Sequence, residues 1–167
     1  MENVDFKIGH DQREEMLRNV WVSHDARWFI KTIEKYGLNA ANELNRKVIR
    51  SMGKTEIKTF MNGGGIEKIE NIDRMKSLMT TASKLFFPKE HKYEFKILSE
   101  NELLGHVIEC YVHKNVEKAG ITGLYRCAAK PRFESWIAAM GLKGEIVQKE
   151  DSASCGGTCG IVFRIDW

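Results

Sequence analysis

Apolar side chains recur at steps of three and four residues through the first half of the chain, which is the period of an α-helix. From Asp11 to about Tyr36 this pattern predicts a first helix, which Gly37 ends. A second helix is predicted from about Asn39 to Met61, ahead of three consecutive glycines, and a third from about Ile66 to Phe86. The first half of the chain is therefore predicted to be entirely helical.

The period changes to two in the second half, where Tyr93, Phe95 and Ile97 alternate with charged residues. Further segments are predicted as strands over Leu104–Val112, Glu145–Lys149 and Gly160–Trp167, and as helices over Val116–Arg126 and Pro131–Met140. We expect an α+β fold in which three N-terminal helices pack on a C-terminal ββαββ antiparallel sheet unit.

Length and composition favour one domain, residues 1–167, with a helical half over 1–88 and the ββαββ half over 89–167. The net charge of +3 comes from basic and acidic residues scattered along the chain, so nucleic acid is not expected as a partner. No stretch approaches the roughly 18 uncharged apolar residues of a membrane helix, and no signal peptide is recognisable. We therefore expect a cytoplasmic protein without a membrane partner, and leave its oligomeric state open.

Four cysteines lie in the C-terminal half: Cys110, Cys127, Cys155 and Cys159. In a reducing compartment such cysteines are more often buried, metal-binding or catalytic than disulfide-bonded. Two glycines between Cys155 and Cys159 allow a tight turn that aims both thiols at one centre. All four cysteines are candidate ligands of zinc or an iron–sulfur cluster, with burial as small hydrophobes as the alternative.

A thiol nucleophile would need a neighbouring imidazole or cation, and His106 and His113 are the histidines nearest to Cys110 in sequence. Strand alternation favours His106 as the residue on the same face as Cys110. A hydrogen-bonded structural histidine is the alternative.

A second group of candidate residues lies on the first helix, where His24 falls within a stripe of Leu17, Val20, Trp21 and Trp28. In one interpretation His24, Asp25 and Asn45 form the polar wall of a ligand pocket that Trp21 and Trp28 line. In the other, His24 is a buried imidazole that hydrogen-bonds a polar group.

The stretches Leu17–Phe29, Ala41–Asn45 and Met52–Lys54 resemble the N-terminal signature of uncharacterised cytosolic proteins grouped with L-2-amino-thiazoline-4-carboxylic acid hydrolase. Cys110–Val112, Ala119–Gly120, the remaining cysteines and Phe163–Ile165 resemble the C-terminal half of the same family. The C-terminal half is also similar to the vinyl-reductase-type small-molecule-binding domain. These resemblances imply a pocket for a small organic molecule, with thiols or a metal at its floor.

Two functional hypotheses follow, and whether the chain is an enzyme stays open between them. The first is a hydrolase-like enzyme that acts on a small organic compound, with Cys110, His24 and Asp25 as catalytic residues and Trp21, Trp28, Asn45 and His106 as ligand-binding residues. The second is a non-catalytic module that binds a small molecule or a metal, zinc or an iron–sulfur cluster. A weaker third is a helical interaction subunit whose cysteines are only core.

Overall fold

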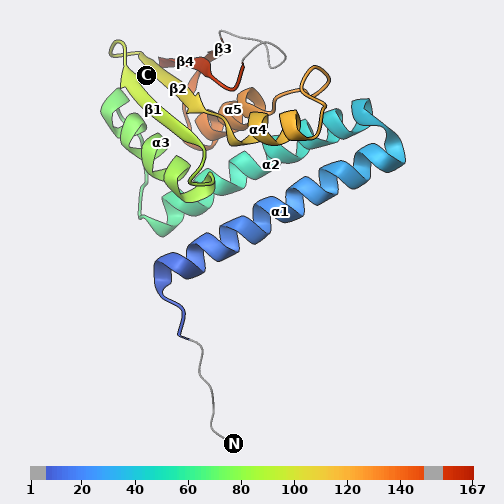
Figure 1. The fold of residues 1–167 in the computed structure, drawn as a ribbon. Coiled ribbons are helices and arrows are strands. Elements are labelled where there is room, and N and C mark those ends of the chain that lie inside the picture. The colour runs from blue at the N-terminus through green and yellow to red at the C-terminus, as the bar shows by residue number, and fades with distance from the viewer. Residues whose placement is uncertain (1–6, 149–155) are drawn as a thin grey trace, which may run out of the picture.

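The computed structural model describes residues 7–148 and 156–167 (Figure 1). The elements follow one another as α1 (His10–Tyr36), α2 (Leu38–Gly63), α3 (Ile72–Phe86), β1 (Lys92–Ile97), β2 (Glu102–Glu109), α4 (Tyr111–Lys118), α5 (Ala129–Ala139), β3 (Lys143–Gln148) and β4 (Cys159–Asp166). Within these two ranges, no helix combines the length and the apolar composition that crossing a membrane requires.

Local sequence signals set where the N-terminal helices begin and end. Gly37 separates α1 from α2 with φ of 82°, a left-handed conformation that glycine adopts without steric cost. Asn71 caps α3, since its side-chain oxygen accepts a hydrogen bond of 2.9 Å from the N–H of Arg74. Because this cap stands at residue 71, α3 begins at Ile72, six residues after the predicted Ile66.

The four strands form one antiparallel sheet in the order β1-β2-β4-β3. The last strand lies inside the sheet, with Phe163 of β4 opposite Leu103 of β2 on one side and Ile146 of β3 on the other. Both neighbouring positions are buried, so the register joins the apolar sides of the three strands. The predicted α+β class is confirmed.

The predicted strand Leu104–Val112 is too long at its C-terminal end. β2 stops at Glu109, and Cys110 is the N-cap of α4, where its Sγ accepts a hydrogen bond of 3.4 Å from the N–H of His113. Cys110 therefore does not alternate with His106 along one strand. The sheet unit also holds two helices, α4 and α5, between its two pairs of strands.

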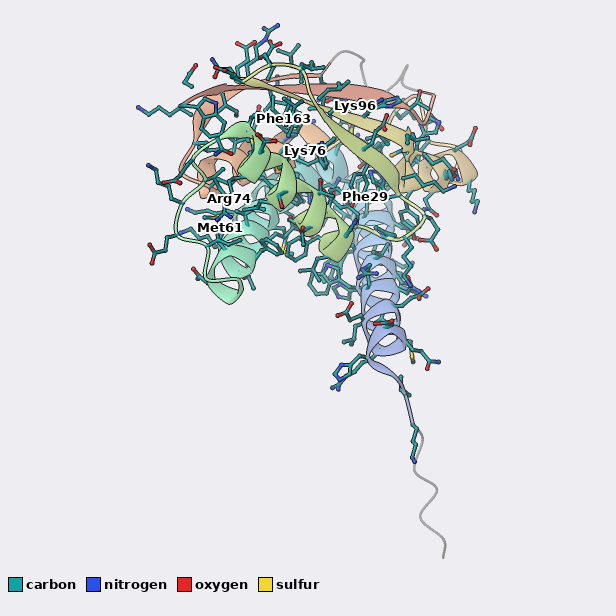
Figure 2. All side chains as sticks on the ribbon, turned by 90° about the vertical axis from the view of Figure 1, so that its left-hand side faces the viewer. Phe29, Met61, Arg74, Lys76, Lys96 and Phe163 are labelled. Atoms are coloured by element: carbon teal, nitrogen blue, oxygen red, sulfur yellow. The ribbon has the colours of Figure 1, made fainter. Side chains whose placement is uncertain are left out.

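The hydrophobic core lies between the sheet and helices α2, α3 and α5. Trp136 and Phe163 are fully buried, and the Phe133 ring lies with its centroid 5.3 Å from each of theirs. Helix α1 contributes no buried residue. Figure 2 shows Phe29 on α1 and the N-terminal part of that helix extending beyond the body of the molecule.

A buried carboxylate fixes α5 to α2. Glu56 accepts hydrogen bonds from the guanidinium of Arg132, one of them 3.0 Å from Nε, and from Nε1–H of Trp136 at 2.8 Å. The two helices approach closely at Gly53, where a Cβ atom would lie 2.8 Å from the carbonyl oxygen of Arg132. The charge-assisted hydrogen bonds compensate Glu56 for its loss of hydration.

Candidate functional site

The first group of predicted residues lies on the outer surface of α1. The His24 ring stands between the rings of Trp21 and Trp28, at centroid distances of 5.9 and 6.4 Å. Nε1–H of Trp28 donates a hydrogen bond of 3.1 Å to Nε2 of His24. Both tryptophans are more than half exposed, and neither lines the two cavities described below.

Asp25 lies beside His24, with Oδ1 3.8 Å from Nδ1 of the imidazole. Partial burial raises the pKa of Asp25, and the charge of His24 and a hydrogen bond from it act in the opposite direction. Both side chains are about half exposed. Their catalytic roles stay a prediction.

Asn45 belongs to a different part of the molecule, around Tyr125. Burial raises the pKa of Tyr125, the charges of Cys127 and Cys110 raise it further, and a hydrogen bond from Asn45 lowers it. The Phe29 ring of α1 contacts the Tyr125 ring edge to face at 5.7 Å. The fold thus brings Asn45 and two of the predicted cysteines into the electrostatic surroundings of one tyrosine.

Cys110 and His113 meet the turn that leads into β4. The N–H of Cys110 donates a hydrogen bond of 2.9 Å to the carbonyl oxygen of Gly157. The His113 ring packs on the same glycine, because a Cβ atom on Gly157 would lie 3.1 Å from Cδ2 of the ring. Cys159 follows two residues later, opposite Val107 of β2.

Cys127 precedes α5, and its Sγ accepts a hydrogen bond of 3.4 Å from the N–H of Ala129. The guanidinium of Arg46 donates to the carbonyl oxygen of Cys127. His106, the predicted strand partner of Cys110, instead has Nδ1 3.2 Å from Oε1 of Glu94 on β1. Its side chain is partly exposed at that ion pair.

The predicted metal ligand Cys155 lies outside the described residues. Among the residues that the structure describes, no group of three or more His, Cys, Asp or Glu side chains could hold a metal ion. A metal site on the described cysteines would thus require a further ligand, and the four-cysteine site stays a prediction.

A cavity of about 460 Å³ lies where the N-terminal half of α1 meets the end of α3 and the start of β1. Its walls include Arg18, Ser83, Phe87, Lys89, His91 and Tyr93, none of which the sequence singled out. A second hollow of about 340 Å³ lies between α5 and β3, with mostly apolar walls. The first cavity is the more polar of the two, and its titratable and hydrogen-bonding side chains make it the candidate site.

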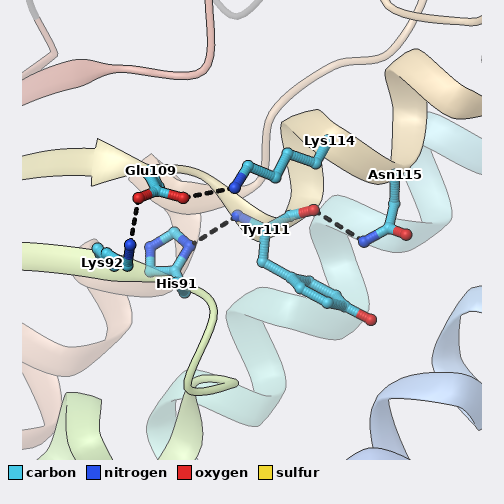
Figure 3. A network of polar contacts seen from close by, with 6 residues as sticks. All are labelled: His91, Lys92, Glu109, Tyr111, Lys114 and Asn115. Atoms are coloured by element: carbon cyan, nitrogen blue, oxygen red, sulfur yellow. Dashed lines mark hydrogen bonds and ion pairs between the residues drawn. The ribbon is translucent and has the colours of Figure 1, made fainter.

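His91 lines this cavity, and Figure 3 shows its hydrogen bond with Tyr111. The N–H of Tyr111 donates a hydrogen bond of 3.2 Å to Nδ1 of His91, so the neutral ring carries its proton on Nε2. Burial lowers the pKa of His91 to about 4, and the positive charge of Arg132 acts in the same direction. At neutral pH the ring therefore offers Nε2–H as a hydrogen-bond donor.

The segment around His91 is fixed by an ion-pair network on the same strand ends. Glu109, at the end of β2, pairs with Lys114 of α4 and with Lys92 of β1 (Figure 3). Hydrogen bonds from the two lysines lower the pKa of Glu109 to about 2. These pairs tie β1, β2 and α4 together next to the Tyr111–His91 hydrogen bond.

Ser83 is fully buried in the wall of the cavity. Among the described residues, its Oγ is the buried side-chain oxygen or nitrogen atom for which no hydrogen bond is formed. Burial raises the pKa of neighbouring Tyr93, and a side-chain contact with the Ser83 hydroxyl lowers it, a contact too loose to meet the geometry of a standard hydrogen bond. Tyr93 itself reaches the carbonyl oxygen of Thr80 at 3.5 Å, the outer limit of a hydrogen bond.

Arg18 brings a largely buried guanidinium to the cavity from α1, with its side chain 13% exposed. Its Nε donates a hydrogen bond of 3.2 Å to the carbonyl oxygen of Leu85. The carboxylate of Glu14 lies 3.9 Å from Nη2, a distance too long for a hydrogen bond. Among the residues that the structure describes, no hydrogen bond from the outer nitrogens of Arg18 is formed, so they can donate to a ligand.

No family model matches the chain, and no curated protein matches it. Among solved structures, the chain is similar to a trafficking protein particle complex subunit 3 from Naegleria fowleri covalently bound to palmitic acid, at 15% identity and a TM-score of 0.56. That similarity covers 93% of this chain and 96% of the other, and it supports the fold. A protein of the H-NOX family, studied for heme distortion, gives 13% identity and a TM-score of 0.47 over 100% of this chain and 77% of its own.

Proposed function

We propose that this chain binds a small organic anion, a carboxylate with an apolar body, in the cavity beside Arg18, Ser83 and His91. The observation that carries the proposal is the fully buried Ser83 hydroxyl, which borders the cavity and, among the described residues, makes a loose contact with Tyr93 but no hydrogen bond of standard geometry. Leaving such a group unpaired costs about 1–3 kcal/mol. A bound ligand that hydrogen-bonds Ser83 would remove this cost.

The polar groups of the cavity are mainly donors. His91 offers Nε2–H, Arg18 offers its outer guanidinium nitrogens, and Ser83 can donate its hydroxyl proton. A carboxylate accepts several hydrogen bonds at once, and charge-assisted bonds of this kind are about twice as strong as neutral ones. The donor set therefore favours a carboxylate over an amine or an alcohol.

The local charge supports the same choice. The Arg132 guanidinium lies over the Phe87 ring at 4.3 Å, and its charge helps to lower the pKa of His91. Lys84 and Lys89 stand in the cavity wall. Three basic residues of the lining stand against two acidic residues of α1, and although Lys89 pairs with Glu15 and Arg132 with Glu56, the balance of charge still favours an anion over a cation.

The remaining walls are apolar and suit the body of an organic molecule. Phe87 borders the cavity with a mostly buried ring that packs against Trp136, stacked at 5.8 Å, and edge to face against Tyr93 at 5.9 Å and His91 at 5.1 Å. Pro88 follows in the same wall. A volume of about 460 Å³ with apolar walls and a few convergent polar groups is typical of small-molecule sites.

The structural neighbour adds one supporting point. The trafficking protein particle complex subunit carries palmitic acid covalently. A fold of this kind therefore accommodates an organic acid in that protein, and we extend this chemical class, without the covalent link, to the cavity of the present chain.

The test is binding of two carboxylates, benzoate and hexanoate, against their neutral analogues benzamide and hexanol. Backbone amide chemical shifts of the ¹⁵N-labelled chain would be followed over a millimolar titration. We expect the carboxylates to shift the amides of Ser83, Lys84 and Lys89, and Arg18→Gln to weaken the binding at least about tenfold, because it removes the charged donor.

Arg27→Gln is the matched control, since Arg27 is an exposed arginine of the same helix that bonds Ser23 and does not line the cavity. It should leave the titration unchanged. Equal shifts with benzamide or hexanol would contradict the proposed preference for an anion. Equal binding by the Arg18 and Arg27 variants would contradict it too.

The second candidate is soft-metal binding by the cysteines, and one observation favours it. Cys110 and Cys127 come from separate segments, yet both lie close enough to Tyr125 for their charges to raise its pKa. A further ligand would have to come from outside the described residues, and Cys155 is the predicted one. Elemental analysis of anaerobically purified protein should find about one zinc per chain, or an equivalent amount of iron, and Cys127→Ser and Cys155→Ser should each abolish metal binding. Metal-free wild-type protein would contradict this candidate.

Hydrolase activity stays a prediction.

A further inference from the structure

Helix α1 exposes an apolar stripe made of Leu17, Val20, Trp21 and Trp28. Their exposed fractions are 64%, 69%, 53% and 64%. Large apolar side chains occur singly on most surfaces, but four along one line of one helix form a contiguous patch, and such patches mark interaction sites. Tryptophan is also the residue type most enriched among the residues that dominate interface energies.

The stripe is not the face that α1 turns to its own chain. Among the half-buried positions of α1, Arg18, Val22, Phe29 and Ile33 define a second face with helical spacing. Phe29 reaches Tyr125, and Arg18 reaches Leu85. At 100° per residue the centre of the stripe lies roughly 130° from the centre of this second face, although Trp21 at the edge of the stripe comes within about 60° of Arg18. Figures 1 and 2 show α1 at the edge of the molecule.

The stripe is also ordered. His24 lies within it, between the two indole rings, and accepts the hydrogen bond from Trp28. Side chains that are already held by such contacts lose less conformational entropy when a partner covers them.

The sequence of α1 fits itself in antiparallel orientation. When two copies cross at the point between Val22 and Ser23, Leu17 lies opposite Trp28 of the partner subunit and Trp21 lies opposite His24 of the partner subunit. The same register sets Val20 opposite Asp25 of the partner subunit, at the edge of the apolar centre, and Glu14 opposite Lys31 of the partner subunit beyond it, where Lys31 also pairs with Glu34 of its own helix. Two-fold symmetry repeats every pair, so the interface has an apolar middle and two oppositely charged pairs at its ends.

The area is sufficient for such a pair. The four stripe residues and His24, each more than half exposed, offer roughly 100 Å² apiece. That gives about 500 Å² per copy and about 1,000 Å² in total, the lower bound for a specific protein interface. The flanking polar residues would add to it.

We propose that two copies of this chain associate through antiparallel pairing of their α1 helices, with the apolar stripe of Leu17, Val20, Trp21 and Trp28 at the centre. The four stripe residues do not line the cavity, whereas Glu14 of the charged pair does, so Trp28→Ala and Lys31→Glu are the variants that test this inference independently of the proposed ligand.

The first experiment is sedimentation velocity of the full chain from about 1 to 200 µM. We expect a reversible monomer–dimer equilibrium, with the dimer weakened at least about tenfold by Trp28→Ala. Lys54→Glu, an exposed charge reversal on α2, is the matched control and should leave the equilibrium unchanged.

Charge reversal tests the register. Glu14→Lys and Lys31→Glu should each weaken self-association, because each sets like charges opposite one another. The double variant should recover it, and an equimolar mixture of the two single variants should form mixed dimers. Circular dichroism of each variant would check that the fold is retained, since both side chains are exposed.

A chain that remains monomeric at 200 µM overturns the proposal. So does a dimer that Trp28→Ala and the charge reversals leave unchanged, which would use another face. Co-sedimentation of monomeric chain with vesicles of anionic phospholipid would assign the stripe to a lipid surface instead.

Discussion

Helices α1 and α3 show how differently two amphipathic helices of one chain can be used. α3 has 15 residues, of which six are buried, whereas the 27 residues of α1 include none. The apolar stripe of α3 faces the sheet and belongs to the core. The stripe of α1 faces outward, and a separate, more mixed face of α1 rests on the body. Equal periodicity therefore does not imply equal burial.

The largest expected difference in the free energy of unfolding is between a tryptophan of the core and a tryptophan of α1. Trp136→Ala removes a fully buried ring that stacks on Phe87 and donates to Glu56, and should lower the free energy of unfolding by about 3–5 kcal/mol. Trp28→Ala on α1 should change it by less than about 0.5 kcal/mol. Urea unfolding followed by circular dichroism at low micromolar concentration measures both. Equal losses would mean that α1 is as integral to the fold as α5.

The next effect concerns the buried carboxylate. Glu56→Gln leaves Arg132 without its ion pair in a largely buried setting and should cost about 3 kcal/mol in the free energy of unfolding. Glu134→Gln, which breaks the exposed pair with Arg50, should cost less than about 1 kcal/mol. The same unfolding measurement compares the two. A smaller loss for the Glu56 variant than for the Glu134 variant would contradict the assigned role.

The pH dependence should come partly from His91. Its pKa falls from 6.5 to about 4 on folding, because burial disfavours the charged ring. Between these values the unfolded chain binds a proton that the folded chain does not, so stability falls as the pH drops from about 6.5 to 4, by at most about 3 kcal/mol. Below pH 4 this contribution no longer changes.

His91→Gln should flatten that part of the profile of unfolding free energy against pH. His10→Gln is the control, because His10 is exposed at the start of α1, and it should keep the wild-type slope. Parallel profiles for wild type and His91→Gln would contradict the neutral, buried state of this ring.

The smallest effect compares two buried serines. Ser83→Ala should raise the free energy of unfolding of the ligand-free chain by about 1 kcal/mol, because it removes a hydroxyl without a hydrogen bond. Ser135→Ala should lower it by about 1 kcal/mol, because the Ser135 hydroxyl donates a hydrogen bond of 3.1 Å to the carbonyl oxygen of Pro131. Thermal denaturation resolves the difference in sign. A loss of stability in both variants would mean that Ser83 is already paired.

The candidate sites were predictable to different degrees. The sequence predicted that the strand continues past residue 110, because Val112 fits the alternation, and only the hydrogen bond to Cys110 Sγ reveals a helix N-cap there. His91 gave no pattern, since its partner Tyr111 lies 20 residues away. The small polar residue Ser83 among apolar helix positions was the one local signal of the cavity.

The sequence by itself determined the helical first half, the glycine turn between α1 and α2 and the α+β class, because periodicity and turn residues act within a few positions of the chain. Only the tertiary structure decided which face of α1 meets its own chain, that Cys110 and Cys127 share one tyrosine, and where a cavity opens. All three features depend on contacts between residues that are distant in sequence. Side chains from several elements pack in the same space, and no local pattern shows which of them meet.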